Sequence, residues 1–143
     1  MSIRRTILLR GDAEEHAGPA GADITPGHLV QFDPSEPGGY IPHGTAGGAA
    51  APWFARENWE NNGAGIDDDI ASGAEVVVLK PNLGATINAV TADTIAVGDF
   101  VESAGDGTVR PHGSGAVVGV ASKDSDLSGD VGRVEIIIAP LGA

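Results

Sequence analysis

The sequence contains no cysteine, so neither disulfide bonds nor thiolate metal sites can stabilise its fold. Basic residues are scarce: eight lysines and arginines face twenty acids, which gives a formal net charge of −12. Such a surface repels nucleic acid and anionic membranes, and we therefore expect neither as a partner. The sequence also lacks any apolar run close to the roughly 20 residues of a membrane-spanning helix.

The surplus of acids permits two interpretations. One is a protein from a halophile, in which concentrated salt screens the repulsion between carboxylates. The other is an ordinary acidic protein, whose charge favours solubility. The acids are spread along the chain instead of gathered in a tail, and only two of the bases are lysine, Lys80 and Lys123. We expect the halophilic interpretation to hold.

The 143 residues amount to one domain of ordinary size. Short apolar runs rich in Val and Ile alternate with turn residues, and this pattern predicts a small all-β domain, either a β-barrel or a β-sandwich. We divide the chain into an N-terminal arm and loop over 1–22, with a short strand in 1–10 and a loop over 11–22, and a β domain over 23–143. The expected strands of the domain are Leu29–Phe32, Val76–Leu79, Thr86–Ala89, Phe100–Ser103, Ala116–Ala121 and Val134–Ile138.

A short pattern occurs three times: an apolar anchor, a glycine three residues later, and then a β run. The three copies begin at Ile24, Ile70 and Ile95. Because the strand follows the glycine so closely, the pattern predicts a tight turn that needs the backbone freedom of glycine. The copies are unevenly spaced, so they indicate a reused turn and not a solenoid.

The connection between the first two expected strands, residues 33–72, is long, and long connections usually carry function or pack on their own. Within seven residues it holds half of the six aromatic residues of the chain, Trp53, Phe54 and Trp59. These side chains either cover the barrel or contact a partner, where aromatic residues dominate binding energy. The basic arm is open to two interpretations as well, a plain edge strand or a strap that lies on an acidic partner. Its bases are Arg4, Arg5 and Arg10.

Two acidic stretches are candidate cation sites. The first is Asp124–Glu135, in which Asp124, Asp126, Ser128, Gly129 and Glu135 match positions of a calcium-binding EF-hand loop. That motif requires flanking helices, whereas both flanks here are β-branched. We therefore interpret the stretch as the exposed turn of a β-hairpin, with a calcium-binding β module as the alternative. The second stretch, Asp67–Asp69, is interpreted as a solvated turn, because three adjacent side chains cannot all face one ion.

The sequence offers no catalytic framework. The nucleophile elbow Gly-x-Ser-x-Gly is absent, since Ser114 lies directly between two glycines. No glycine is followed by lysine, which excludes a phosphate-binding P-loop. The four histidines show no i, i+3 or i+4 spacing that would suit a metal site; they are His16, His28, His43 and His112. We expect a protein that is not an enzyme and holds neither cofactor nor metal.

Taken in order along the chain, several segments resemble the capsid decoration (cement) proteins of tailed phages. The resemblance covers roughly residues 24–138, and its strength lies in the ordered series of segments, since no single motif is diagnostic. The segments are Ile24–Val30, His43–Gly48, Trp53–Glu57, Gly63–Gly73, Ala96–Val109 and Gly119–Ser122.

The resemblance implies a structural protein on the outer surface of an HK97-type icosahedral capsid. Members of this family resemble small β-barrels or β-sandwiches, often form trimers, and clamp neighbouring major capsid subunits against the pressure of packaged DNA. The acidity of this chain departs from the usual pattern and implies a virus of haloarchaea. We expect shell or intersubunit contacts from 1–10 and 53–59, chiefly from Arg4, Arg5, Arg10, Trp53, Phe54 and Trp59. The alternatives are another virion component, such as a turret or tail part, and the calcium-binding β module.

Overall fold

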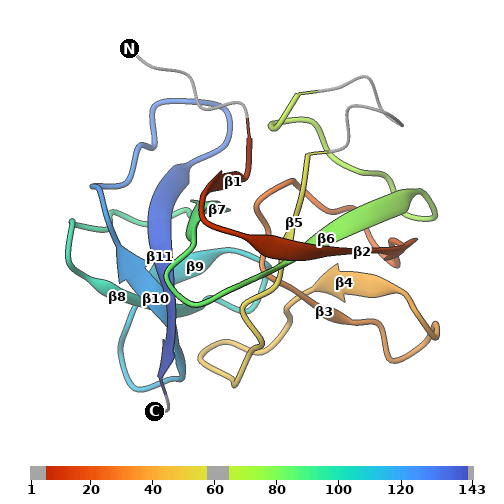
Figure 1. The fold of residues 1–143 in the computed structure, drawn as a ribbon, viewed down its shortest axis with the longest axis horizontal. Helices are drawn as coiled ribbons and strands as arrows, with labels where there is room; N and C mark the ends of the chain where they lie inside the picture. Colours follow the sequence, from red (N-terminus) through yellow and green to blue (C-terminus); the bar gives the residue numbers. More distant parts are fainter. Residues whose placement is uncertain (1–5, 58–64, 142–143) are drawn as a thin grey trace.

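Two groups of strands lie side by side in the protein (Figure 1). The computed structural model describes residues 6–57 and 65–141, and within these ranges all regular structure is β-strand. The first group is a six-stranded antiparallel sheet in the order β1-β7-β11-β10-β8-β9. Its strands are β1 (Leu8–Arg10), β7 (Thr86–Val90), β8 (Phe100–Ser103), β9 (Val109–Pro111), β10 (Val117–Ala121) and β11 (Arg133–Leu141).

The second group combines a three-stranded sheet, in the order β2-β6-β5, with the hairpin β3-β4. The strands of this group are β2 (Ala13–Pro19), β3 (Val30–Phe32), β4 (Tyr40–Pro42), β5 (Phe54–Ala55) and β6 (Glu75–Pro81).

None of the described segments forms a helix of the length and hydrophobicity needed to cross a membrane.

The six-stranded sheet curls back on itself. Thr91, directly after β7, forms a parallel bridge with Val109 of β9, and Thr91 Oγ1 donates a hydrogen bond to the Val109 carbonyl at 2.7 Å. Because β9 is the last strand of the sheet, this bridge joins one edge to a strand near the other. The strands from β7 to β9 thus close in the manner of a small barrel, and the predicted all-β class is confirmed.

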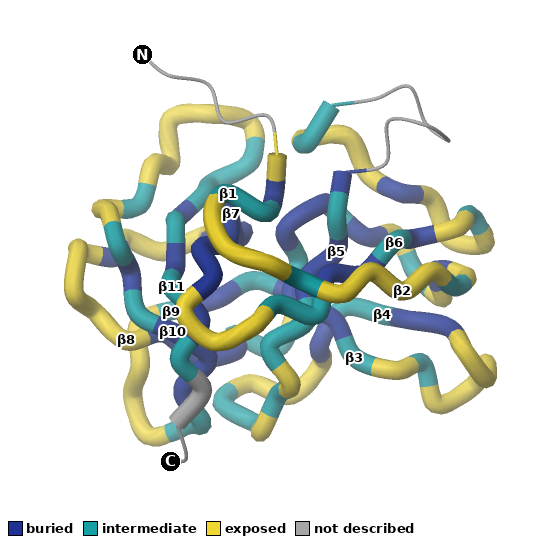
Figure 2. The backbone as a smooth tube through the Cα atoms, viewed as in Figure 1, coloured by how far each residue is buried: buried dark blue, intermediate teal, exposed yellow. Residues whose placement is uncertain are grey.

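Strand alternation builds two hydrophobic cores, one per group of strands. In β11, Val134, Ile136 and Ile138 are at most 1% exposed and belong to the larger core. Strand β5 stands between the groups, because its two residues point in opposite directions: Phe54 lies in the larger core and Ala55 in the smaller one. Figure 2 shows the buried residues concentrated in the interior of the molecule, whereas β2 is exposed along most of its length.

The thrice-repeated pattern forms the same turn each time. Gly27, Gly73 and Gly98 have φ angles of +94°, +90° and +90°. In each copy the residue after the glycine donates its N–H to the carbonyl three residues earlier, as in His28 N to Thr25 O at 2.9 Å. Positive φ at the third residue of such a turn defines type II, so the predicted role of glycine is confirmed. The anchors Ile24, Ile70 and Ile95 are all fully buried.

Strands occur where all six apolar runs predict them, but the expected loop over 11–22 is wrong for Ala13–Pro19. This segment forms β2, which pairs over its whole length with β6. Its composition does not favour a strand; the pairing with the Val-rich β6 determines its conformation. The long connection 33–72 contains β4 and β5, and β9 was also not expected. Ile7 of the N-terminal arm is fully buried in the larger core, so the chain is already part of the fold at this residue.

The type II turns lead to a testable prediction. Replacement of Gly98 by alanine should lower the free energy of unfolding by about 1–2 kcal/mol, because an L-residue resists positive φ. A Cβ at this position would meet no atom within 4 Å, so the effect isolates backbone strain. Urea unfolding followed by circular dichroism measures it.

The matched control is Gly129→Ala, since Gly129 is also exposed but is not among the glycines with positive φ. This variant should change the free energy of unfolding by less than about 0.5 kcal/mol. Equal losses in both variants would contradict the assignment.

Candidate functional site

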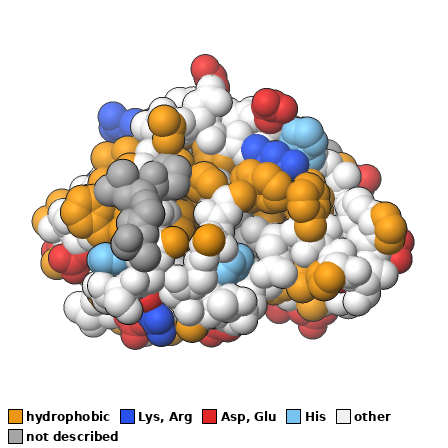
Figure 3. Space-filling model, turned by 90° about the horizontal axis from the view of Figure 1, so that it is seen from below, with side chains coloured by type: hydrophobic (Ala, Val, Ile, Leu, Met, Phe, Trp, Pro, Cys, Tyr) orange, Lys and Arg blue, Asp and Glu red, His pale blue; other side chains and the backbone are white. Residues whose placement is uncertain are grey.

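An aromatic cluster with a lysine at its centre occupies the surface of the smaller group of strands. The register of the β3–β4 hairpin places Phe32 opposite Tyr40, and their rings stack at 5.6 Å. Trp53 meets Phe32 edge-on at 5.0 Å. Lys80, from β6, holds its Nζ 4.1 Å from the centre of the Trp53 ring and 5.3 Å from that of Phe32. We call these four residues the aromatic–lysine cluster. Figure 3 shows a face of the molecule on which hydrophobic side chains gather beside a basic side chain.

The aromatic side chains of the cluster differ in how far they are exposed to solvent. Tyr40 is buried, with 3% of its surface exposed, whereas Phe32 remains 55% exposed. Cation–π contacts of this kind contribute about 0.5–1 kcal/mol at exposed sites. The cluster therefore holds a large aromatic surface open to contact while Lys80 fastens it to the three-stranded sheet.

An open pocket of about 430 Å³ lies beside the cluster. Two aromatic side chains of the cluster form one part of its wall, and small or polar side chains form the rest. The mixture of apolar surface with a few polar groups is typical of ligand pockets. The lining residues are Val30, Gln31, Phe32, His43, Thr45, Ala49, Ala50, Ala51 and Trp53.

His43 in this pocket belongs to a buried hydrogen-bonded chain. Its Nε2 faces the Ala49 carbonyl at 3.1 Å and must donate, since a carbonyl only accepts. Its Nδ1 therefore accepts from Ser103 Oγ at 2.7 Å, and Ser103 Oγ in turn accepts from the Gly105 N–H. Ser103 is fully buried, so no substrate carbonyl can reach its hydroxyl. The pair orders the loop after β4, and the burial of Ser103 keeps its hydroxyl away from solvent.

Glu102, next to Ser103 in β8, is a buried carboxylate with four donors. Oε2 accepts two hydrogen bonds from Arg110, at 2.9 and 2.7 Å, and Oε1 accepts the backbone N–H groups of Gly113 and Gly115. The Gly113 hydrogen bond, supported by Arg110 and Gly115, lowers the pKa of Glu102 from its ordinary value, although burial opposes this. Glu102 thus fixes the loop that follows β9.

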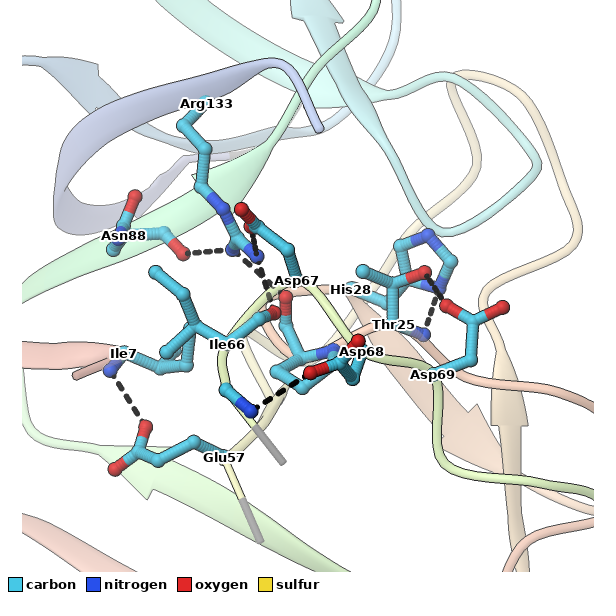
Figure 4. Close-up of polar contacts among 12 residues, drawn as sticks. Ile7, Thr25, His28, Glu57, Ile66, Asp67, Asp68, Asp69, Asn88 and Arg133 are labelled. Carbon is cyan, nitrogen blue, oxygen red and sulfur yellow. Dashed lines mark hydrogen bonds and ion pairs between the residues drawn. The ribbon is translucent and has the colours of Figure 1, made fainter. Parts of the chain in front are cut away.

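A polar junction joins loops of both groups of strands (Figure 4). The side chain of Arg133, at the start of β11, is 12% exposed and donates to the carbonyls of Pro26 and Ile66, at 2.8 and 2.6 Å. It also forms an ion pair with Asp67 at 3.0 Å. Burial lowers the pKa of Arg133 and Asp67 raises it, and a guanidinium stays protonated at neutral pH. A Cβ on Gly27 would lie 2.5 Å from Arg133 Nη1, so the junction needs glycine there.

Glu57 and the acidic run Asp67–Asp69 also have their hydrogen-bond partners at this junction. Glu57 Oε2 accepts the Ile7 N–H at 2.8 Å and thereby ties the N-terminal strand region to the end of the aromatic stretch. The three carboxylates of the run have separate partners: Asp67 binds Arg133, Asp68 accepts the Gly65 N–H, and Asp69 accepts the Thr25 hydroxyl. The expected turn is confirmed, and its side chains diverge (Figure 4).

The stretch Asp124–Glu135 forms most of the connection between β10 and β11 and the start of β11, so the expected hairpin is confirmed. Asp124 accepts the Val97 N–H, while Asp126 accepts both the N–H and the hydroxyl of Ser128. Glu135 lies within β11 and faces Lys123 at 3.7 Å. Among the described residues no group of three acids or histidines has the geometry to hold a metal ion.

The predicted contact residues do not form one site. Arg4, Arg5 and Trp59 lie outside the described residues. Arg10 is exposed at the end of β1, and Trp53 is half-buried in the aromatic–lysine cluster. Phe54 is fully buried in the larger core, so the prediction that it touches a partner directly is wrong; the residue follows the alternative of a core aromatic.

Sequence reasoning missed the partners of Trp53. Phe32 and Tyr40 flank the Pro- and Gly-rich segment 33–39, and two aromatics on either side of such a turn signal a cross-strand pair. No comparable signal exists for Lys80, whose place depends on β6 lying beside this hairpin.

Comparison with known proteins finds a solved structure with a similar fold. Neither a comparison with family models nor one with curated proteins found a match. Among solved structures, the chain is similar to the N base of head fiber gp8.5 in bacteriophage phi29. The likeness is one of fold. The sequences of the two chains are 16% identical, and their structures superpose with a TM-score of 0.62. The match covers 92% of this chain and 98% of the phage chain.

Glu102 makes the stability of the protein depend on pH. Because its pKa is lower in the folded protein, the ionised carboxylate stabilises the fold above its ordinary pKa of 4.5, and this contribution disappears as the pH falls through the lowered value. At pH 7, Glu102→Gln should lower the free energy of unfolding by about 2–3 kcal/mol. Urea unfolding at several pH values should show the gap to the wild type closing below a pH of about 4.

The control is Glu36→Gln, at an exposed turn position, which should follow the wild type at every pH. A gap between wild type and Glu102→Gln that stays constant from neutral to acidic pH would contradict the role assigned to the carboxylate.

Proposed function

We propose that this chain is a structural protein of a virus particle, attached to the outer face of the capsid of a tailed virus. The observation that carries the proposal is the likeness of fold to the N base of a phage head fiber, which extends over nearly the full length of both chains. The sequence resemblance to capsid decoration proteins supports the same class of function independently of that likeness.

The finer proposal is a decoration, or cement, protein that binds major capsid subunits of an HK97-type shell as a homotrimer and reinforces the shell against internal DNA pressure. Weak contacts suffice for such a protein, because many copies act together. Arg10 and Trp53 are the described candidates for contact with shell or neighbouring subunits. A second candidate is the base of a head fiber, favoured by the likeness of fold to the N base of the phage head fiber.

A non-enzymatic role fits the geometry of the described residues. The hydroxyl of Ser103 is buried, and the acids Asp67, Glu102 and Asp126 are engaged in turns and ion pairs. These arrangements support a protein that works through its surface.

Copy number in purified particles tests the proposal. Quantitative mass spectrometry should find about one copy per major capsid subunit if the protein forms a cement layer that covers the shell. A ratio of a few per cent would replace the cement role by a fiber base or vertex component. Absence of the protein from purified particles would contradict the proposal altogether.

Particles stripped of the protein provide the control experiment. Purified protein should rebind to them, and Arg10→Glu should weaken the rebinding if Arg10 contacts the shell. Lys123→Glu reverses a charge of the same sign at an exposed site, with 59% of the side chain accessible, and should leave rebinding unchanged.

We also propose that the particle belongs to a virus of a halophilic host. The net charge of −12 makes the folded chain repel itself, and molar salt shortens the screening length to about 3 Å. Circular dichroism should therefore show loss of β structure when salt is removed and its recovery in molar sodium chloride. A spectrum that is the same with and without salt would contradict the halophilic origin.

A further inference from the structure

We propose that the pocket beside the aromatic–lysine cluster binds a neutral saccharide. This inference goes beyond a structural role in the particle and does not depend on it. It is carried by the combination of an exposed aromatic ring, small side chains and hydrogen-bonding groups around one open pocket.

The aromatic wall suits the apolar face of a sugar ring. Phe32 is 55% exposed although its ring is held in place by Tyr40 and Trp53. The C–H bonds of a pyranose carry a slight positive charge and stack on the negative face of an aromatic ring. The methyl groups of Ala49, Ala50 and Ala51 leave room for such a ring to approach.

The polar part of the wall suits the hydroxyl groups. Gln31 uses its Oε1 to accept the Gly44 N–H at 3.0 Å, which orients its amide nitrogen as a donor. Thr45 contributes a hydroxyl that both donates and accepts. His43 is fixed on both ring nitrogens, so it shapes the pocket and does not compete for the ligand.

The charges favour a neutral ligand. No carboxylate, lysine or arginine lines the pocket, so nothing there would pair with a charged group. The net charge of −12 disfavours anions over the whole surface. Lys80 does not line the pocket; its ammonium group lies over the rings of Trp53, at 4.1 Å, and Phe32, at 5.3 Å, where these aromatic faces hold it.

The site is also held in its binding shape. The Trp53 carbonyl accepts the Val30 N–H at 2.9 Å, and the Trp53 N–H bonds to Ala51, so both sides of the pocket share one hydrogen-bonded frame. A preorganised pocket loses little conformational entropy on binding, which matters for a ligand that makes few strong contacts.

Fluorescence tests this proposal in a Trp59→Phe background, where Trp53 is the single tryptophan. The probes are D-glucose, D-galactose, D-mannose and N-acetyl-D-glucosamine, each titrated to about 50 mM, a range that detects millimolar affinity. At least one should change the Trp53 emission saturably and show saturation transfer from the protein in NMR. Replacement of Phe32 by alanine should weaken that binding about fivefold, as expected for the loss of one stacking contact.

Phe100→Ala is the matched control, because Phe100 is also exposed, at 46%, but does not line the pocket. Absence of a saturable response to all four sugars, or equal weakening in both variants, would overturn the proposal. A third outcome is that Phe32→Ala prevents rebinding to stripped particles while no sugar binds. The pocket would then hold a shell protein, which overturns the saccharide and leaves the proposed function standing.

Discussion

The buried guanidinium of Arg133 is the contact on which the arrangement of the two groups of strands depends. Removing this charge from water is costly unless carbonyls and an acid surround it. The required partners come from Pro26, Ile66 and Asp67, which are far from Arg133 in the sequence. Each partner is therefore held at a fixed distance from β11. Because Pro26 lies within the first of the repeated turns, the same contact sets where β3 enters its hairpin, and through β3 it sets the position of Phe32 in the aromatic–lysine cluster.

The parts of the fold that the sequence predicts are those governed by local rules. Strand positions follow β-branched runs, and the turns at Gly27, Gly73 and Gly98 follow from a spacing that only glycine satisfies. The missed elements depend on a partner. β2 consists largely of acids and small residues and is a strand because β6 lies beside it. Glu102 and Arg133 gave no signal: Glu102 depends on the pairing of β8 with β9, which brings Arg110 and the following loop to it, and Arg133 depends on carbonyls of distant segments. Of the candidate site, sequence reasoning identified Trp53 from its local aromatic density; the pocket around it required the register of β3 with β4.

Much of the acidity is used to build turns. Asp99 accepts the Ala96 N–H, Asp106 the Thr108 N–H and Asp126 the Ser128 N–H. Each carboxylate satisfies a backbone donor that the sharp turn would otherwise leave without a partner. The hydrogen bonds from Thr108 and Ser128 lower the pKa values of Asp106 and Asp126, so these carboxylates favour the ionised form that makes the turn. This explains why acidic runs that resemble cation sites in the sequence serve local structure in the fold: their oxygens point to neighbouring N–H groups and not toward one centre.

The lack of charged side chains in the pocket bears on both proposals, attachment to a capsid and binding of a saccharide. The proposed stacking of one sugar ring on Phe32 gives few contacts, and we expect a Kd of about 1 mM for a single copy. Capsid attachment changes this, because a shell presents many copies at fixed spacing, and linked weak sites gain 10²–10⁴-fold in avidity when their geometry permits simultaneous contact. Within each copy, the hydrogen bonds of Trp53 and His43 hold the pocket in one shape. The proposed attachment to a shell and the proposed weak recognition by an aromatic pocket are thus compatible in one small β domain: the shell would supply many copies, and the hydrogen-bonded pocket would bind without rearrangement.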